Sequence, residues 1–438
     1  MGDEYSGIFS QQNRRDILKT LAAVPVVGGL YSFDADASTV DSSDYPYPGQ
    51  YGGNHLNQAY ADSDDSPTDI DSVRSVEEDV DIDRIPVVGP NGNVAAAGEF
   101  NIIVAGNGDS EVLDADGIVS TPLIHDGKVY YGDQLSDNII DVESGEIIES
   151  NEGSNRVFRT VSSSGEFFRE KYKGLEKFDP DNLDTINSID IVSNPRPYGF
   201  IPRDDDFIAV FEQGVGKWDY EGDRLAGRAN RSYNTNISGT DDVVVAIRNG
   251  DDILEVLDPE TDDMAEKASL ENSVFTQFEA PCAIFGNSFY NVNRDGVAFG
   301  TSYDDTEEEL KFDWKTELDG DGRNTVVWGE VAIVSTTEQV VGLDTESGDE
   351  IWSTSDANGF VSMPHDTELY VGGENTLYEL TAELGDRAAN SGLNEYTNDG
   401  TVGTSQLLAG IEDWRSGALD TPKLLALINY WRSGETIK

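Results

Sequence analysis

The chain has 438 residues, enough for one large domain with appendages. It carries 85 aspartates and glutamates against 29 lysines and arginines, a formal net charge of −56. The acids are spread along the whole chain, so nucleic acid and anionic membrane surfaces are excluded as partners because both would be repelled. The single cysteine, Cys282, excludes an intramolecular disulfide and is expected to be a buried apolar residue.

The first 37 residues have the pattern of an export signal. Arg14 and Arg15 precede an apolar stretch at 21–30, and an Ala-Asp-Ala sequence at 35–37 supplies a small-residue cleavage site. This pattern resembles a twin-arginine signal, which implies export of an already folded protein to the cell surface or beyond. The apolar stretch is too short to span a bilayer, so we expect no membrane span after cleavage. The alternative is a cytosolic start with a chance arginine pair.

Residues 38–85 are expected to lead into the first repeat. Residues 41–60 are rich in Tyr, Pro, Gly and Asn. Residues 61–72 are acidic and poor in apolar side chains, which predicts an exposed loop. Over 75–85, acids alternate with aliphatic residues, a pattern that suits a solvated strand closing a ring of sheets.

From about residue 86 to 390, short runs of β-branched and aromatic residues alternate with turns of Asp, Gly and Asn. Acids that end a strand recur at roughly 40-residue intervals, the length of a four-stranded propeller blade. These acids are Asp114, Asp141, Asp179, Asp219, Asp258, Asp304 and Asp344. One such unit cannot bury both faces of its sheet, whereas a radial arrangement of several units does. The sequence therefore predicts an all-β, eight-bladed propeller, with seven blades as the alternative.

The eight expected blades can be located by their apolar core runs, the first blade being shortened. The runs lie at 101–105, 128–132, 167–168, 207–211, 243–247, 289–292, 331–335 and 369–371. Asp126-Gly127 is a typical hairpin turn before the second of these runs. His125 and His365 occupy the same place in their repeats, immediately before such a turn, so we interpret them as repeat residues and not as metal ligands.

Three stretches share a more specific pattern. In the first stretch, a Ser-Gly turn at 144–145 follows Tyr130-Tyr131-Gly132. In the second, a Ser-Gly turn at 347–348 and then Trp352 follow Leu343-Asp344. In the third, the run Leu377–Leu380 follows Leu369–Gly372. This pattern resembles the PQQ-like β-propeller repeat family over about residues 40–390. The family includes quinoprotein dehydrogenases and the non-enzymatic propeller of the outer-membrane assembly machinery. The resemblance implies the fold and leaves the function open.

A quinoprotein dehydrogenase is the enzymatic alternative that this resemblance implies. Such an enzyme would hold the quinone PQQ beside a calcium ion bound by Asn and Glu oxygens, with a catalytic Asp and a stacked aromatic ring. The family's dehydrogenases also commonly carry an adjacent cysteine pair that contacts the quinone. This chain has one cysteine and departs from that pattern. We therefore expect no catalytic residue and no cofactor, with PQQ and calcium as the alternative.

Residues 391–438 change from strand to helical periodicity. Two apolar stripes with helical spacing lie 17 residues apart, each followed by Arg-Ser-Gly. Thr404 and Thr421 fit the N-cap position, so the tail is predicted to be two copies of one short helix forming a hairpin. The stripes are Leu407, Ile411 and Trp414 in the first copy and Leu424, Ile428 and Trp431 in the second.

The duplicated tail resembles a dockerin-like module, which implies calcium-binding loops before its helices. The nearest ligand candidates are Glu395 and Asp399, and the rest of the calcium pattern is degraded, so they are weak metal candidates. Two interpretations of the apolar stripes stay open. They close the hairpin's own core, or a two-helix unit too small for a core lays them on a partner.

The sequence thus predicts an exported, non-enzymatic propeller. It would act as a protein-binding or scaffold module at the cell surface, docked through its C-terminal helical pair. The alternatives are a PQQ-dependent dehydrogenase and a polysaccharide-binding propeller. The global acid excess resembles the proteins of salt-loving archaea, in which molar salt screens self-repulsion.

Overall fold

The computed structural model describes residues 60–61, 65–89, 91–106, 109–115, 120–133, 135–152, 157–161, 165–171, 174–190, 199–203, 205–211, 214–229, 233–239, 242–248, 252–278, 280–385, 404–416 and 427–428. The chain divides into two units, 1–40 and 41–438, and every described residue belongs to the second. The expected export signal at 1–37 and the calcium candidates Glu395 and Asp399 lie outside the described residues.

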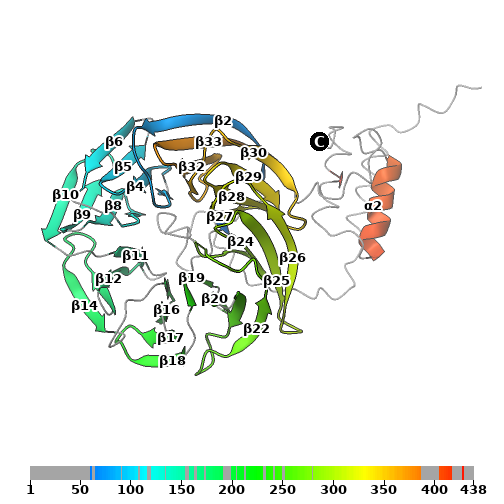
Figure 1. Cartoon of the computed structure of the whole chain (residues 1–438), viewed down its shortest axis with the longest axis horizontal. Helices are drawn as coiled ribbons and strands as arrows, with labels where there is room; N and C mark the ends of the chain where they lie inside the picture. Colours follow the sequence, from blue (N-terminus) through cyan, green and yellow to red (C-terminus); the bar gives the residue numbers. More distant parts are fainter. Residues whose placement is uncertain are drawn as a thin grey trace, which may run out of the picture. The chain divides into compact units, whose positions relative to one another are not determined.

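The described strands form eight small sheets, which Figure 1 shows as blades arranged in a ring. Blade 1 is β3 (Val87–Val88), β4 (Val94–Ala97), β5 (Asn101–Gly106) and β6 (Asp109–Asp114). Blade 2 is β7 (Leu123–His125), β8 (Lys128–Gly132), β9 (Ser136–Asp141) and β10 (Ile147–Glu152). Blade 3 is β11 (Val157–Val161), β12 (Phe167–Lys171), β13 (Gly174–Phe178) and β14 (Thr185–Asp190). Blade 4 is β15 (Gly199–Pro202), β16 (Asp206–Phe211), β17 (Gly214–Asp219) and β18 (Arg224–Ala229).

The other half of the ring continues the same order. Blade 5 is β19 (Tyr233–Gly239), β20 (Val244–Arg248), β21 (Ile253–Leu257) and β22 (Glu266–Glu271). Blade 6 is β23 (Ala283–Phe285), β24 (Ser288–Val292), β25 (Val297–Asp304) and β26 (Glu309–Glu317). Blade 7 is β27 (Gly322–Trp328), β28 (Val331–Thr336), β29 (Val340–Asp344) and β30 (Glu350–Thr354). Blade 8 holds β31 (Phe360–Val361), β32 (Glu368–Gly372) and β33 (Thr376–Gly385). The predicted eight-bladed propeller is confirmed.

The ring is closed by a strand from the start of the chain. β2 (Ser66–Glu78) pairs antiparallel with β33 and takes the outer place in blade 8 (Figure 1). The closing strand therefore begins at Ser66, inside the segment expected to be a loop, and not at residue 75. β1 (Tyr60–Ala61) pairs parallel with β27, the inner strand of blade 7. The start of the chain thus contributes to both the inner and the outer edges of the sheets.

The first turn of blade 2, between β7 and β8, is formed by residues that tolerate its backbone conformation. Asp126 and Gly127 both have positive φ angles, 49° and 71°, which a two-residue hairpin turn requires and which Asp and Gly tolerate. Asp366, in the matching turn of blade 8, has a φ of 51°. The prediction of a tight hairpin at Asp126-Gly127 is confirmed.

Tryptophans on outer strands join neighbouring blades. The indole of Trp352 in β30 lies over Gly342, where a Cβ atom would come within 2.3 Å of the ring. Its Nε1–H donates to the backbone oxygen of Pro67 in β2 at 3.1 Å, so it also holds the closing strand. Trp314 in β26 lies over Gly300 in the same way and donates to the oxygen of Thr345 in blade 7 at 2.9 Å.

The tail contains α2 (Thr404–Ser416), which confirms the first predicted helix. Leu427 and Ile428 are also helical, and the rest of the second predicted helix lies outside the described residues. No helix within the described residues is both long and apolar enough to cross a membrane.

Candidate functional site

The predicted partner-binding residues of the tail are described only in part. Leu407 and Ile411 are buried and Ile428 is half-buried, whereas Leu408, between the first two, is 50% exposed. Trp414 belongs to α2, but its side chain lies outside the description, as do Leu424 and Trp431. The structure therefore assigns Leu407 and Ile411 to a protein interior and leaves the role of the tryptophans as a prediction.

The two repeat histidines lie in different blades. His125 ends β7 and packs edge-on against Phe167, with ring centroids 4.9 Å apart. Nδ1 of His365 lies 3.7 Å from a carboxylate oxygen of the adjacent Asp366. Within the described residues, no group of three or more His, Cys, Asp and Glu side chains is placed to hold a metal ion.

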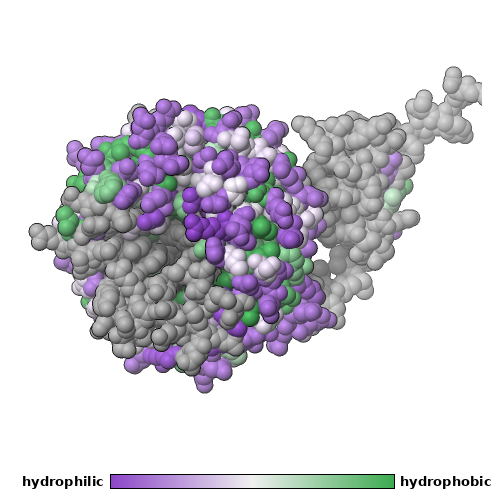
Figure 2. All heavy atoms as spheres, in the orientation of Figure 1, coloured by the Kyte–Doolittle hydropathy of each residue, from purple (hydrophilic) through white to green (hydrophobic). Residues whose placement is uncertain are grey.

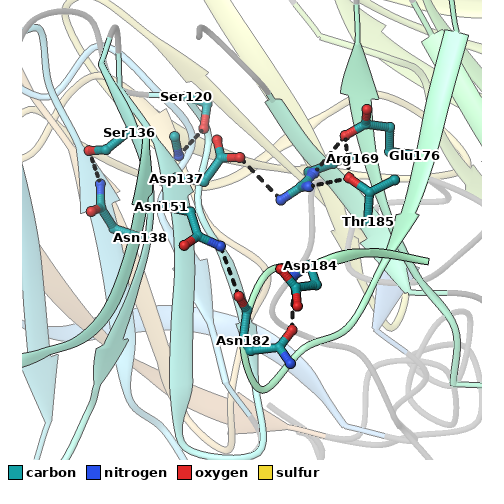
Figure 3. Close-up of polar contacts among 11 residues, drawn as sticks. Ser120, Ser136, Asp137, Asn138, Asn151, Arg169, Glu176, Asn182, Asp184 and Thr185 are labelled. Atoms are coloured by element: carbon teal, nitrogen blue, oxygen red, sulfur yellow. Dashed lines mark hydrogen bonds and ion pairs between the residues drawn. The ribbon is translucent and has the colours of Figure 1, made fainter. Parts of the chain in front are cut away.

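A buried charge cluster lies between blades 2 and 3 (Figure 3). Arg169 in β12 stands opposite Glu176 in β13, and its Nε lies 3.1 Å from Oε2 of that glutamate. Its Nη1 lies 3.1 Å from Oδ2 of Asp137, which comes from β9 in blade 2. Nη2 donates to Oγ1 of Thr185 at 3.0 Å, and the guanidinium lies 5.1 Å from the centroid of the Phe178 ring.

This cluster is a structural link between two blades. Arg169 is 1% exposed and Asp137 is fully buried, so a ligand has no access to the charges. A second contact across the same boundary runs from Nδ2 of Asn151 to the backbone oxygen of Asn182, at 2.8 Å (Figure 3). No local pattern in the sequence indicates the buried partners of Arg169, because it stands at the start of three consecutive charged residues, Arg169, Glu170 and Lys171.

Blade 5 contains another buried carboxylate that is paired with an arginine. Glu255 in β21 is fully buried and accepts a hydrogen bond from the hydroxyl of Tyr233 at 2.8 Å. Arg248 in β20 donates to its other oxygen. In blade 4, burial raises the pKa of Asp206 although Arg203 and Lys217 lie nearby. Asp137 and Glu255 are thus buried carboxylates held by cations or hydroxyls, and Asp206 is half-buried beside its two cations.

The quinone site that the family resemblance implies can be compared with these residues. Such a site needs oxygen ligands converging on a calcium ion and, commonly, two adjacent cysteines. The described residues contain no group of three or more carboxylate, histidine and cysteine side chains placed for a metal. Cys282 stands alone and buried, and burial raises the pKa of its thiol to about 12. The expectation of no cofactor therefore stays a prediction, with PQQ and calcium as the alternative, and we derive no chemistry from that group.

Large apolar side chains are exposed on one half of the ring. Seven of them belong to the described residues of the propeller: Phe100, Val112, Leu135, Ile147, Ile148, Ile186 and Leu225. All seven lie in blades 1 to 4, and the described residues of blades 5 to 8 contribute none. Figure 2 shows apolar atoms within a mostly hydrophilic surface along the rim beside β10. Exposed apolar groups gathered on one side of a soluble protein mark candidate interaction sites.

The exposed apolar residues occupy two kinds of position. Phe100 and Leu135 lie in the turns between the second and third strands of blades 1 and 2. The other five lie on the outer strands β6, β10, β14 and β18. Leu135 is held in a rigid turn, because its backbone N–H and that of Ser136 both donate to Oδ1 of Asp133, at 2.8 and 2.7 Å. These residues were not identified from the sequence, because the repeat pattern does not distinguish apolar residues that are buried from apolar residues that are exposed.

Comparison with known proteins identifies the fold. No family model matches the chain, and neither does any curated protein. Among solved structures, BamB from Moraxella catarrhalis is similar with a TM-score of 0.50 and 11% identity, covering 71% of this chain and 99% of that one. A quinohemoprotein alcohol dehydrogenase from Pseudomonas putida HK5 is similar with a TM-score of 0.54 and 10% identity, covering 90% and 96%. Sqt1 from Saccharomyces cerevisiae has a TM-score of 0.53 and 9% identity, covering 72% and 98%.

Proposed function

We propose that this protein is a non-enzymatic β-propeller that binds other proteins. The observation that carries this proposal is the gathering of exposed apolar side chains on blades 1 to 4 of a strongly acidic chain. Leaving isoleucine and leucine in contact with water costs free energy, which a partner recovers by covering them. A propeller offers the rigid and extended surface that such binding needs.

The fold itself does not decide between binding and catalysis. The similar structures include an alcohol dehydrogenase as well as BamB and Sqt1, so the choice rests on the residues of this chain. Its buried charges Arg169, Asp137 and Glu255 make contacts within and between blades and are closed to solvent. Its single cysteine departs from the cysteine pair of the quinoprotein dehydrogenases. Both facts favour binding without a cofactor.

We further propose that the protein is exported through its twin-arginine-like start and works at the cell surface. The C-terminal helical pair would dock the propeller there, through side chains such as the exposed Leu408 of α2. Leu407 and Ile411 would form the interior of that helical unit, because they are buried. The propeller would then hold a second protein as its cargo.

The test is an affinity purification from the native cell envelope in high salt after chemical cross-linking. The mature protein from residue 38 is compared with a version that ends at Ala389. We expect one protein to be recovered with both versions, through the propeller, and a second only with the full-length chain, through the tail. Recovery of no protein with either version would contradict the proposal.

The same preparation tests the two alternatives. Reduction of an artificial electron acceptor by an alcohol or sugar, dependent on added PQQ and calcium, would establish the dehydrogenase. Retention of the tail-truncated protein on immobilised envelope polysaccharide, with no protein partner recovered, would establish the carbohydrate-binding propeller. We expect neither result.

A further inference from the structure

Three consecutive blades carry the same exposed pair of residues at the start of their outer strands. The pair is an acid followed two positions later by an apolar residue. We call these six residues the rim patch: Glu146 and Ile148, Asp184 and Ile186, Asp223 and Leu225. The apolar side chains are 49%, 60% and 46% exposed, and all three acids are exposed. The patch therefore offers alternating apolar and negative groups along the rim of blades 2 to 4.

Each acid of the rim patch is held in place by the turn before it. The backbone N–H of Glu146 donates to Oγ of Ser144 at 3.3 Å. That of Asp184 donates to Oδ1 of Asn182 at 2.9 Å, and that of Asp223 to Oδ1 of Asp219 at 2.7 Å. These contacts fix the backbone from which the apolar residue projects two positions later. The surface is thus preorganised, which lowers the entropy cost of binding.

The other blades do not repeat the exposed pair. Blade 5 has Lys267 at the position of the apolar residue. In blade 6 the equivalent residue is Asp313, which is exposed and charged, and in blade 7 Ile351 is half-buried and packs against the core. The repeat therefore does not force an exposed apolar residue at this position.

The outer strands of blades 2 to 4 have an uncovered edge. β10, β14 and β18 end their sheets, and the described residues place no strand beyond them (Figure 1). Natural proteins usually protect such edges with charged residues, so apolar side chains there are a liability unless they are covered. Cations close to the patch make contacts of their own. Lys128 is paired with Asp181 at 2.8 Å and Arg228 with Glu266 at 2.6 Å, and the guanidinium of Arg224 lies 6.0 Å from the centroid of the Trp218 ring.

We propose that the rim patch binds a cationic segment of a partner protein. Apolar residues of the segment cover Ile148, Ile186 and Leu225, and its lysines or arginines face the three acids. This inference rests on the proposed function and names the surface and the partner chemistry. A second copy of this chain is a poor occupant, because each copy carries a formal charge of −56 and the two would repel each other.

The test uses two labelled synthetic peptides, one alternating leucine with lysine and one alternating leucine with glutamate. Fluorescence anisotropy is measured against the mature protein at low and at molar salt. We expect the lysine peptide to bind at least about ten-fold more tightly than the glutamate peptide at low salt. The variant I148S/I186S/L225S should lose about ten-fold in affinity for the lysine peptide. Equal binding of the two peptides, or unchanged binding by the variant, would overturn the proposal.

Two matched variants serve as controls. Lys267→Ser changes the equivalent position of blade 5, and Lys315→Ser changes an exposed residue on the outer strand of blade 6. Both should bind the lysine peptide as the wild type does. The three rim substitutions are at exposed positions, so circular dichroism should show an unchanged fold. A comparable loss of binding in either control would show that the rim patch is not the site.

The inference and the proposed function can fail separately. If the affinity purification recovers a partner while the triple variant leaves peptide binding unchanged, the rim patch is wrong and the binding function stands. If light scattering shows a dimer of the wild type that the triple variant loses, a second copy covers the patch and the cationic partner is wrong.

Discussion

Asp141 stabilises the turn between the third and fourth strands of blade 2. Its Oδ1 accepts hydrogen bonds from the backbone N–H and the hydroxyl of Ser144, both at 2.9 Å. These hydrogen bonds lower the pKa of Asp141 below its ordinary value of 3.8. Asp344 makes the equivalent contacts with Ser347 in blade 7. The strand-ending acids that revealed the repeat are thus turn-stabilising residues in these two blades.

Replacing Asp141 by alanine should destabilise the protein by about 1 kcal/mol at pH 7, because two hydrogen bonds at a partly exposed turn are lost. The folded pKa is below the unfolded one, so this contribution is fully present above pH 3.8 and is lost as the pH falls through the folded pKa. Urea unfolding of wild type and Asp141→Ala at pH 7 and pH 2.5, in constant high salt, measures the difference. If the difference in unfolding free energy between the two proteins does not become smaller at pH 2.5, this role of Asp141 is contradicted.

Arg169 joins blade 3 to blade 2 through a buried ion pair with Asp137. Arg169→Leu would leave Asp137 buried without its guanidinium partner, which should cost about 3–5 kcal/mol at pH 7.

Denaturant unfolding at pH 7 measures the effect of Arg169→Leu. The control is Arg74→Leu, which removes a cation whose side chain is 56% exposed beside Glu379. That variant should lose at most about 1 kcal/mol. Equal losses of unfolding free energy in the two variants would mean that the buried cluster contributes no more stability than a surface ion pair.

At the scale of elements, Trp352 connects the ring to its closing strand. Trp352→Phe should cost about 2 kcal/mol, because the hydrogen bond to Pro67 and part of the indole packing over Gly342 are lost. Trp314→Phe should cost about as much, since Trp314 makes the equivalent contacts in blade 6.

The two tryptophan variants should differ in their sensitivity to protease. Limited proteolysis should cleave within β2 faster in Trp352→Phe, because β2 is then held mainly by its pairing with β33. Trp314→Phe should leave the cleavage of β2 unchanged. Equal cleavage in both variants would show that Trp352 does not hold the closing strand.

Most of the strands could be predicted from local sequence patterns. Features that depend on pairing between distant residues could not. Asp126-Gly127 fixes a hairpin by its own φ angles, so it can be recognised from two residues. The pairing of Ser66 with Gly385 joins residues at opposite ends of the propeller, so an acidic segment that resembles a loop becomes a strand only through its distant partner. The contact between Asp137 and Arg169 spans 32 residues and two blades, and no local pattern indicates it.

The candidate surface was harder to predict than the fold. Ile148 and Ile351 occupy equivalent positions in their outer strands, but only the structure shows that the first is exposed and that the second is half-buried against the core. The repeat specifies neither that this residue is apolar, since blade 5 has Lys267 there, nor which way it faces. The helix around Leu407 was predictable from its period, whereas the burial of Leu407 and Ile411 depends on tertiary packing.

At the scale of the whole molecule, the net charge of −56 sets the conditions for stability. Raising the salt concentration from 0.1 M to 1 M shortens the Debye length from about 10 Å to about 3 Å, which screens repulsion among surface acids. We expect the urea midpoint of unfolding to rise steeply over this range of potassium chloride. Sucrose at the same osmolality should raise it much less. A midpoint that is insensitive to the salt would contradict self-repulsion as the main destabilising force.

The central claim is that this acidic propeller binds a protein through the rim of blades 2 to 4. It is tested most directly by quantitative affinity purification from the native envelope, comparing wild type, I148S/I186S/L225S and Leu408→Ser. The account predicts that one cationic partner is recovered with the wild type and with Leu408→Ser and is lost with the triple variant. Equal recovery of that partner with the triple variant, or recovery of no protein at all, would contradict it.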